Sequence, residues 1–328
     1  MRTIHNKIKL AAGVLAVAAL MVSCLPKTQT MGDAGQTLIK LYPEGFTLVA
    51  LDAVATPQQA VLFEVRRDVH SEAALNSATT VVLKYDESII DAYNEENETE
   101  FIPLPTSLGT TEPAPSADGT ITLVFGNGEF AKGPIIKIPD ATQFDFAQPY
   151  ALAYKIVSVS GTGKLSEAVG TEVMVQVLVK NKYDGVYQVT EVTPMLDVVN
   201  ASLTGYYPFT YKLETSGAHS CLCFDSEIWG DYMHPIMSGT NISGYGSFGI
   251  EVFFDPSGDG TIIDLKNPWG NPPANTRMPV LDPSGVNKWD PATHNIQIKY
   301  WMIQPSVVTT PPHIRTYFDE LWIYKGPR

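Results

Sequence analysis

Residues 180–187 read Lys-Asn-Lys-Tyr-Asp-Gly-Val-Tyr, and this stretch decides how the chain is organised. A valine-rich segment ends just before it, and Asp184-Gly185 is a favoured turn, after which a new series of segments begins. Nearly every periodic segment on either side has period two, as expected of strands with one buried face. The sequence therefore predicts an all-β chain with two domains, residues 39–181 and 182–328.

The first domain is predicted to be an immunoglobulin-like β-sandwich, because about seven short strands broken by turn clusters fit that pattern. The expected strands are Gly45–Ala53, Ala60–Arg67, Thr79–Tyr85, Thr120–Phe125, Lys132–Ile138, Tyr150–Ser158 and Thr171–Val179. A short helix is expected over Asp86–Asn94, where acidic residues stand at the helix start. The span Asn94–Ala117 is predicted to be a long surface loop with one extended piece at Phe101–Leu104.

The second domain is predicted to be a closed antiparallel β-barrel, lipocalin-like, or a jelly-roll sandwich. Both architectures avoid long exposed edges, and the sequence leaves both open. The expected strands are Gly185–Val192, Tyr206–Thr215, His219–Phe224, Gly249–Phe254, Thr261–Asp264, Asn295–Ile303 and Thr316–Tyr324.

The first 23 residues have the features of a signal peptide, with three basic residues before an apolar run over Leu10–Val22. This run is too short to span a bilayer as a helix. Met21-Val22-Ser23-Cys24 resembles the bacterial lipobox, in which the cysteine is lipidated and becomes the first mature residue. We therefore expect lipidation at Cys24, a tether over residues 24–38 and a soluble body anchored to the outer membrane. The alternative is an ordinary secretory signal with an incidental cysteine.

The net charge excludes one class of partner. Residues 1–23 carry three of the 22 Lys and Arg residues and none of the 35 Asp and Glu residues, so the mature chain has 19 basic against 35 acidic residues, a net charge of −16. Nucleic acid is therefore not an expected partner.

Two short motifs could hold a metal ion. His219, Cys221 and Cys223 would share one face of a strand, but a fourth ligand is missing nearby, so buried structural thiols are the preferred interpretation. Asp255, Ser257 and Asp259 are spaced as in calcium loops, yet the distal glutamate is lacking and Asp259-Gly260 favours a hairpin turn. We expect no cofactor, with calcium at the second motif as the alternative.

The sequence gives no signature of catalysis. A glycosidase needs two carboxylates flanking the scissile bond, and no such pair stands out among the scattered acidic residues. A Gly-x-Ser-x-Gly elbow is also absent from the sequence. We therefore expect a protein that is not an enzyme.

Aromatic residues suggest a carbohydrate site, because sugars stack their C–H faces on exposed rings while polar side chains bind the hydroxyls. All five tryptophans fall in the second half of the chain. The alternative is that these rings plug the barrel or pack in its core. The glycan-binding candidates are Trp229, Tyr232, His234, Asn267, Trp269, Asn271, Trp301 and Trp322, of which Trp301 and Trp322 would share one outer surface if their strands are neighbours.

Several stretches resemble two-domain Bacteroidota lipoproteins of polysaccharide-utilisation loci, whose N-terminal domain also precedes some endo-beta-N-acetylglucosaminidases. The resemblance is carried by Tyr93-Asn94, Leu104-Pro105, the strand Tyr150–Ile156 with Ser158 and Gly161, the 180–187 linker, Trp289–Tyr300 and Arg315–Tyr324. It implies an Ig-like first domain, a lipocalin-like or lectin-like second domain, and glycan binding at the cell surface for import.

The expected function is thus non-catalytic binding of an oligosaccharide or polysaccharide, alongside an outer-membrane glycan importer. One alternative is a structural or adhesin-type surface lipoprotein of fimbrial kind that binds a protein through its Ig-like domain. A weaker alternative is an unrecognised glycoside hydrolase. The cell surface is the expected location, although Lys27 stands in a segment where exported lipoproteins of this phylum usually carry acidic residues.

Overall fold

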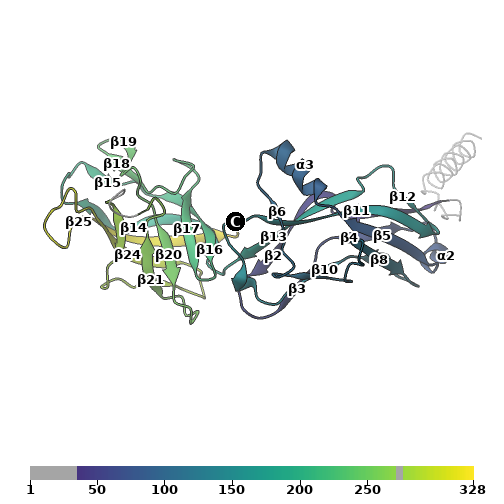
Figure 1. Ribbon diagram of the computed structural model, residues 1–328. Coiled ribbons are helices and arrows are strands. Elements are labelled where there is room, and N and C mark those ends of the chain that lie inside the picture. The colour runs from purple at the N-terminus through teal and green to yellow at the C-terminus, as the bar shows by residue number, and fades with distance from the viewer. Residues whose placement is uncertain (1–34, 271–275) are drawn as a thin grey trace, which may run out of the picture.

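A computed structural model describes residues 35–270 and 276–328. The predicted signal peptide, Cys24 and most of the predicted tether lie outside the described residues. The chain is an all-β protein with two separate hydrophobic cores, as the sequence predicts, and Figure 1 shows two lobes joined near Lys180. Among the described residues, none of the helices is long and apolar enough to cross a membrane.

The N-terminal lobe is a sandwich of three sheets around one core (Figure 1). Its largest sheet has the order β2-β13-β11-β5-β8, with β6 paired to β11. The strands of this sheet are β2 (Gly45–Asp52), β13 (Glu172–Lys180), β11 (Tyr150–Gly161), β5 (Thr79–Tyr85), β8 (Thr120–Phe125) and β6 (Ile102–Pro103).

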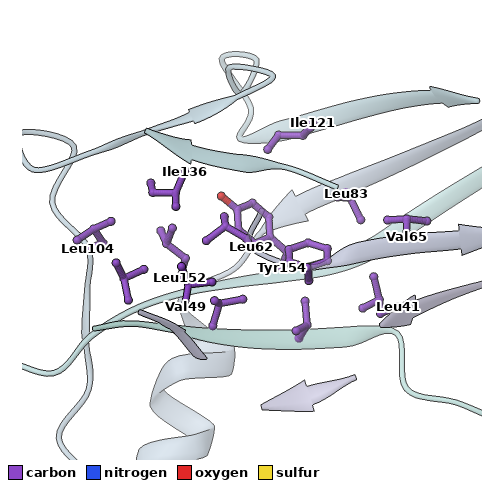
Figure 2. Packing of buried hydrophobic residues seen from close by; sticks show 14 of the residues in the cluster. Leu41, Val49, Leu62, Val65, Leu83, Leu104, Ile121, Ile136, Leu152 and Tyr154 are labelled. Carbon is purple, nitrogen blue, oxygen red and sulfur yellow. The ribbon is translucent and has the colours of Figure 1, made fainter. Parts of the chain in front are cut away.

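Two smaller sheets complete the sandwich, with the orders β12-β1-β4-β9 and β3-β10-β7. Their strands are β12 (Gly163–Leu165), β1 (Thr37–Tyr42), β4 (Glu64–Asp68), β9 (Ala131–Lys132), β3 (Gln58–Val61), β10 (Ile135–Ile138) and β7 (Thr110–Glu112). The sequence missed β1, so Thr37 and Leu38 belong to a strand rather than to the predicted tether. Figure 2 shows how leucine, isoleucine and valine side chains from these sheets interdigitate in the core.

The helices of this lobe are short: α2 (Glu72–Leu75), α3 (Ser88–Asn97) and a 3-10 turn (Ala141–Gln143). Helix α3 covers the outer face of the large sheet, where its Ile90 packs against Ala151, Ala153 and Met174. Alanine at two of these positions leaves room for the helix to approach the strands. The central strands are therefore buried on both faces, which explains the continuous apolar run in β11.

The C-terminal lobe is a nearly closed barrel, which decides between the two predicted architectures in favour of the barrel. The strand order is β21-β20-β17-β16-β14-β25-β24-β22, with β23 paired to β24. The bounds are β21 (Ile262–Lys266), β20 (Glu251–Phe254), β17 (Ser220–Asp225), β16 (Phe209–Gly217), β14 (Gly185–Asp197), β25 (Ile314–Gly326), β24 (Ile296–Ile303), β22 (Met278–Leu281) and β23 (Lys288–Trp289).

A small sheet caps one end of the barrel with the order β15-β18-β19. Its strands, β15 (Leu203–Gly205), β18 (Pro235–Ser238) and β19 (Asn241–Gly244), were not predicted. The barrel interior is filled by large side chains rather than left open, and Tyr187, Tyr211, Tyr300, Phe318 and Trp322 are each at most 1% exposed.

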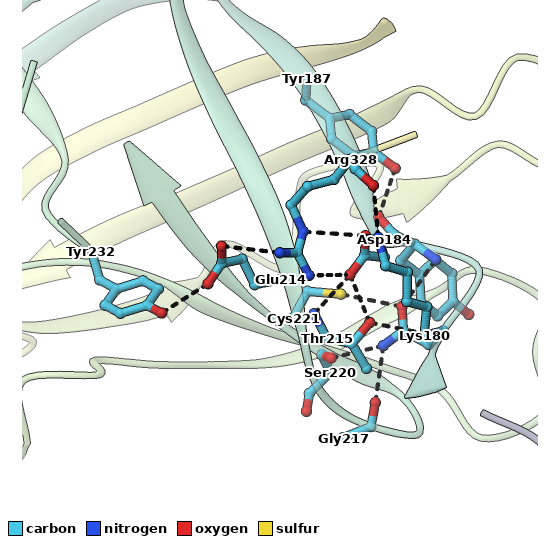
Figure 3. A network of polar contacts seen from close by, with 12 residues as sticks. Lys180, Asp184, Tyr187, Glu214, Thr215, Gly217, Ser220, Cys221, Tyr232 and Arg328 are labelled. Atoms are coloured by element: carbon cyan, nitrogen blue, oxygen red, sulfur yellow. Dashed lines mark hydrogen bonds and ion pairs between the residues drawn. The ribbon is translucent and has the colours of Figure 1, made fainter. Parts of the chain in front are cut away.

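The linker is fixed to the barrel by its own side chains (Figure 3). Asn181 donates to the carbonyl oxygens of Gly217 and Ser220 at 2.9 and 2.8 Å. The ring of Tyr183 stacks on Phe254, with centroids 3.6 Å apart. These contacts insert the linker into the barrel core, so the first barrel strand starts in a fixed place.

Asp184 is the buried charge at this junction, with its side chain 2% exposed. Its carboxylate accepts hydrogen bonds from the Thr215 amide and hydroxyl at 3.1 and 2.9 Å, and from the Arg328 guanidinium at 3.0 Å. Burial opposes ionisation of Asp184, but Arg328, Lys180 and the Thr215 amide outweigh it and lower its pKa. Lys180, the last residue of β13, also donates to the Arg328 carbonyl. This hydrogen bond ties the last strand of the sandwich to Arg328.

We predict that Asp184→Asn lowers the free energy of unfolding by about 2 kcal/mol at neutral pH, because a charged acceptor is lost from a buried hydrogen-bonded site. Since the folded pKa is lowered, the contribution of Asp184 is complete above the ordinary value of 3.8 and is lost as the pH falls below it. Urea unfolding at several pH values measures both effects. The exposed Asp52→Asn is the control, and equal acid sensitivity of the two variants would contradict the prediction.

Candidate functional site

The loop that follows β17 is built around one buried carboxylate. Asp225 is 0% exposed, and it accepts the backbone N–H groups of Glu227, Ile228 and Trp229 at 3.1, 3.2 and 3.0 Å. The main chains of Asp225 and Asp231 also bond to each other in both directions. This closed loop holds Trp229 half-buried and turns the chain toward Tyr232.

Asn267 is a structural residue rather than a ligand-binding one. It is 5% exposed, its side-chain oxygen accepts from the Trp269 amide, and its nitrogen donates to the carbonyls of Ser247 and Arg277. All of its hydrogen-bonding capacity therefore serves the loop, which corrects its assignment as a glycan contact. The same bonds fix the position of Trp269.

Trp269 is the most exposed of the five tryptophans, at 41%. Its indole nitrogen donates to the Tyr232 carbonyl at 3.2 Å, so the structure brings two of the predicted residues together. The Tyr232 hydroxyl donates to Glu214 at 2.8 Å, and its ring packs edge-on against Phe224. Burial, then the Glu214 carboxylate, raises the pKa of Tyr232 to about 12, so the hydroxyl keeps its proton.

We call the surface formed by Glu214, Phe224, Tyr232, Trp269 and Arg328 the Trp269 surface. Arg328 donates to Glu214 at 3.3 Å, which places a guanidinium beside the carboxylate (Figure 3). Trp269 bonds to the main chain of Tyr232, whereas Glu214 and Arg328 lie at the hydroxyl end of the same residue. The surface therefore offers a stacking face at one end of Tyr232, and acceptors and donors for hydroxyl groups at the other. Sequence reasoning missed Glu214 and Phe224, although the alternation of β16 and β17 turns both outward.

His234 and Trp322 are not surface residues, which corrects their assignment as glycan contacts. Both are 0% exposed, and both bind the buried carboxylate of Glu320. His234 Nε2 lies 2.8 Å from Glu320 Oε1, Tyr207 donates to the same oxygen at 2.6 Å, and Trp322 donates to Oε2 at 2.8 Å. His234 Nδ1 faces the Pro235 carbonyl at 2.9 Å, so both ring nitrogens face oxygen atoms. The group is a satisfied polar cluster inside the barrel.

Trp301 lies on the outer face of β24 and is half-buried, but it does not share a surface with Trp322. The register pairs Trp301 with Tyr317 on the outside of the barrel and Trp322 with Ile296 on the inside. Tyr317 is thus the ring beside Trp301, with centroids 6.5 Å apart. The predicted residue Asn271 lies outside the described residues.

The structure shows the contacts made by the two candidate metal motifs. The loop with Asp255, Ser257 and Asp259 connects the paired strands β20 and β21, and Asp255 accepts from the Ser257 amide at 2.8 Å. Cys221 and Cys223 are buried, and the Cys221 thiol donates to Asn181. Burial raises the pKa of both thiols, which keeps them protonated. Over residues 35–270 and 276–328 there is no group of three metal-ligating His, Cys, Asp or Glu side chains.

We predict that Glu320→Ala lowers the free energy of unfolding by about 3–5 kcal/mol, because it leaves three buried donors without their acceptor. Urea unfolding monitored by tryptophan fluorescence measures the loss. The matched control is Glu227→Ala at an exposed position, with an expected change within about 0.5 kcal/mol. A loss below 1 kcal/mol for Glu320→Ala would contradict a structural role.

Comparison with known proteins supports the resemblance inferred from the sequence. A family model described only as a "-like, N-terminal domain" matches residues 39–163. No curated protein sequence matches the chain.

Several of the solved structures that resemble this chain come from Bacteroides. One from Bacteroides ovatus, of unknown function, has a TM-score of 0.51 at 11% identity and covers 88% of this chain and 95% of its own. An auxiliary nutrient binding protein of Bacteroides thetaiotaomicron has a TM-score of 0.42 at 13% identity, covering 85% and 91%. EndoBT-3987 from Bacteroides, in complex with a Man5GlcNAc product, has a TM-score of 0.30 at 17% identity over 41% of this chain and 28% of its own. The predicted family resemblance is thus confirmed, by the family model over the sandwich and by the Bacteroides ovatus structure at the level of the fold.

Proposed function

We propose that this protein binds glycans without catalysis, through the Trp269 surface of its barrel. The carrying observation is the 41%-exposed indole of Trp269, held by the Tyr232 carbonyl, while the hydroxyl of the same tyrosine bonds to the paired Glu214 and Arg328. The indole is fixed before a ligand arrives, so little conformational freedom is lost on binding. The description of one similar Bacteroides structure as a nutrient binding protein agrees in class with this proposal, which itself rests on the surface.

Both stacking and hydrogen bonding would contribute to glycan binding at this site. The exposed face of Trp269 would take the apolar face of a pyranose ring, and Glu214 would accept hydrogen bonds from its hydroxyl groups. Trp229 flanks the same loop, and its ring lies 3.5 Å from the place where a Cβ on Gly244 would stand. Trp229 is therefore packed against the small capping sheet and supports the loop that carries Tyr232.

We predict that Trp269→Ala weakens glycan retention on the order of tenfold, the effect of losing one stacking ring worth about 1.4 kcal/mol. Affinity gels loaded with plant, host and microbial polysaccharides measure the retention. Phe130→Ala, which removes a 62%-exposed ring from the other lobe, is the control. Retention that is unchanged in Trp269→Ala, with an unchanged thermal melt, would move the site elsewhere.

We further propose that the protein is lipid-anchored through Cys24 at the outer membrane, facing the cell surface. The support is the Met21-Val22-Ser23-Cys24 motif after the apolar run. Cys24→Ser should abolish incorporation of labelled palmitate and release the protein from the membrane fraction. Cys221→Ser is the control, since that thiol is buried and should not accept a lipid. Protease treatment of intact cells then distinguishes the outer leaflet from the periplasmic face.

A further inference from the structure

The sandwich of the N-terminal lobe contains a pocket with a volume of about 490 Å³. It lies between the small sheet, which supplies β7 and β10, and strands β5 and β11 of the large sheet. The floor consists of side chains that are at most 7% exposed: Leu104, Ile136, Leu152 and Tyr154. Figure 2 shows Leu104, Ile136 and Leu152 together at one end of the core cluster.

The mouth of this pocket is built from short side chains and prolines. The rim residues are Pro103, Pro105, Thr106, Gly109, Thr110, Thr111, Ala114, Pro115 and Gly119. Protein interiors are normally close-packed, and a gap in an apolar wall forfeits the dispersion contacts of the atoms that line it. An apolar ligand of suitable size would restore those contacts, whereas the short rim side chains do not.

Gly109 shows that this wall is fitted closely to the core rather than loose. A Cβ at this position would lie 2.3 Å from Ile138 Cδ1 and 3.2 Å from Ile136 Cδ1. The backbone at Gly109, just before β7, therefore packs directly against Ile136 and Ile138 of β10. This contact fixes the position of one wall of the pocket.

The polar groups of the pocket are acidic or neutral. Glu87, an exposed residue at the start of α3, is the one ionisable carboxylate among the residues that line it, and none of them is Lys or Arg. Burial, followed by the charge of Glu87, raises the pKa of Tyr85 above its ordinary value. Burial raises the pKa of Tyr154, at the floor of the pocket, to about 12. The mouth therefore favours a cation and repels an anion.

We propose that this sandwich pocket binds a small molecule with an apolar ring system and a cationic amine, the ring lying on Leu104, Leu152 and Tyr154 and the amine near Glu87. Cavities of about 150 Å³ hold a benzene ring, so about 490 Å³ leaves room for two fused rings and a short side chain. The site lies in the lobe that does not carry the Trp269 surface. It would therefore bind a second ligand, separate from the glycan.

The test compares two ligands that share a ring and differ in charge. Tryptamine and indole-3-acetate are titrated into the purified chain by calorimetry at neutral pH. Tryptamine should bind with about fivefold lower Kd, as expected for one partly exposed charge pair. Glu87→Gln should bring the two Kd values to within about twofold of each other. Equal affinities in the unaltered protein would overturn the cationic preference.

A variant that fills the mouth locates the binding. Ala114→Trp should weaken tryptamine binding more than tenfold, while Ala55→Trp, at an exposed position away from the pocket, should leave it unchanged. If Ala114→Trp melts early, Thr106→Trp at the same rim replaces it. Trp269→Ala must not affect tryptamine binding, which separates this site from the glycan surface. No binding of tryptamine at millimolar concentration, or binding that survives the filled mouth, would overturn the proposal.

Discussion

The buried carboxylate of Asp184 is the interaction on which the arrangement of the two lobes depends. A charge that is 2% exposed is costly unless it is fully paired, and Asp184 is paired by Thr215, Lys180 and Arg328. These partners come from the barrel, the last strand of the sandwich and the end of the chain. One turn residue therefore joins three distant segments, and Ala218 from the neighbouring hairpin packs against the sandwich core.

The same cluster extends to the candidate site without a break. Arg328 binds both Asp184 and Glu214, Glu214 accepts from the Tyr232 hydroxyl, and the Tyr232 carbonyl accepts from the Trp269 indole. Each step is a hydrogen bond between side chains or from a side chain to the backbone, so the exposed indole is positioned by contacts that lead back to the linker. A binding surface supported in this way loses little freedom when a ligand arrives.

Most strands were predicted correctly, because a period of two in the side-chain pattern is a local property of the sequence. The point at which the chain passes from one sheet to another is not a local property. The predicted strand Ala60–Arg67 is in fact β3 and β4, and Lys132–Ile138 is β9 and β10. The two breaks meet in space, where a Cβ on Gly133 would lie 1.7 Å from the Phe63 carbonyl oxygen. The apolar pattern continues through the first break, at Leu62 and Phe63, so only the tertiary contact reveals it. At the second break Gly133-Pro134 is a turn signal, which the predicted strand Lys132–Ile138 passed over.

Alternation also gives the two faces of a strand without saying which one is inside. The sequence correctly places Phe318, Glu320 and Trp322 on one face of β25. The glutamate made that face look polar, yet it is the interior one, because His234, Tyr207 and Trp322 supply all the donors that a buried carboxylate needs. Tyr207, one of these partners, lies 113 residues from Glu320 in the chain, so the sequence could not show that the carboxylate is fully hydrogen-bonded.

The two lobes differ in where their candidate sites lie: on the outer surface of the barrel, and in a pocket that reaches the core of the sandwich. The barrel fills its interior with tyrosine, phenylalanine and tryptophan, and Trp269 is its most exposed indole, so the proposed glycan site lies on its surface. The sandwich instead has a pocket that reaches its core, with glycine, alanine, threonine and proline at the rim in place of larger side chains. A ligand seated there would make the dispersion contacts that these short side chains leave unmade. The acidic mouth of that pocket and the mixed-charge Trp269 surface would then select ligands of different chemistry on the two lobes.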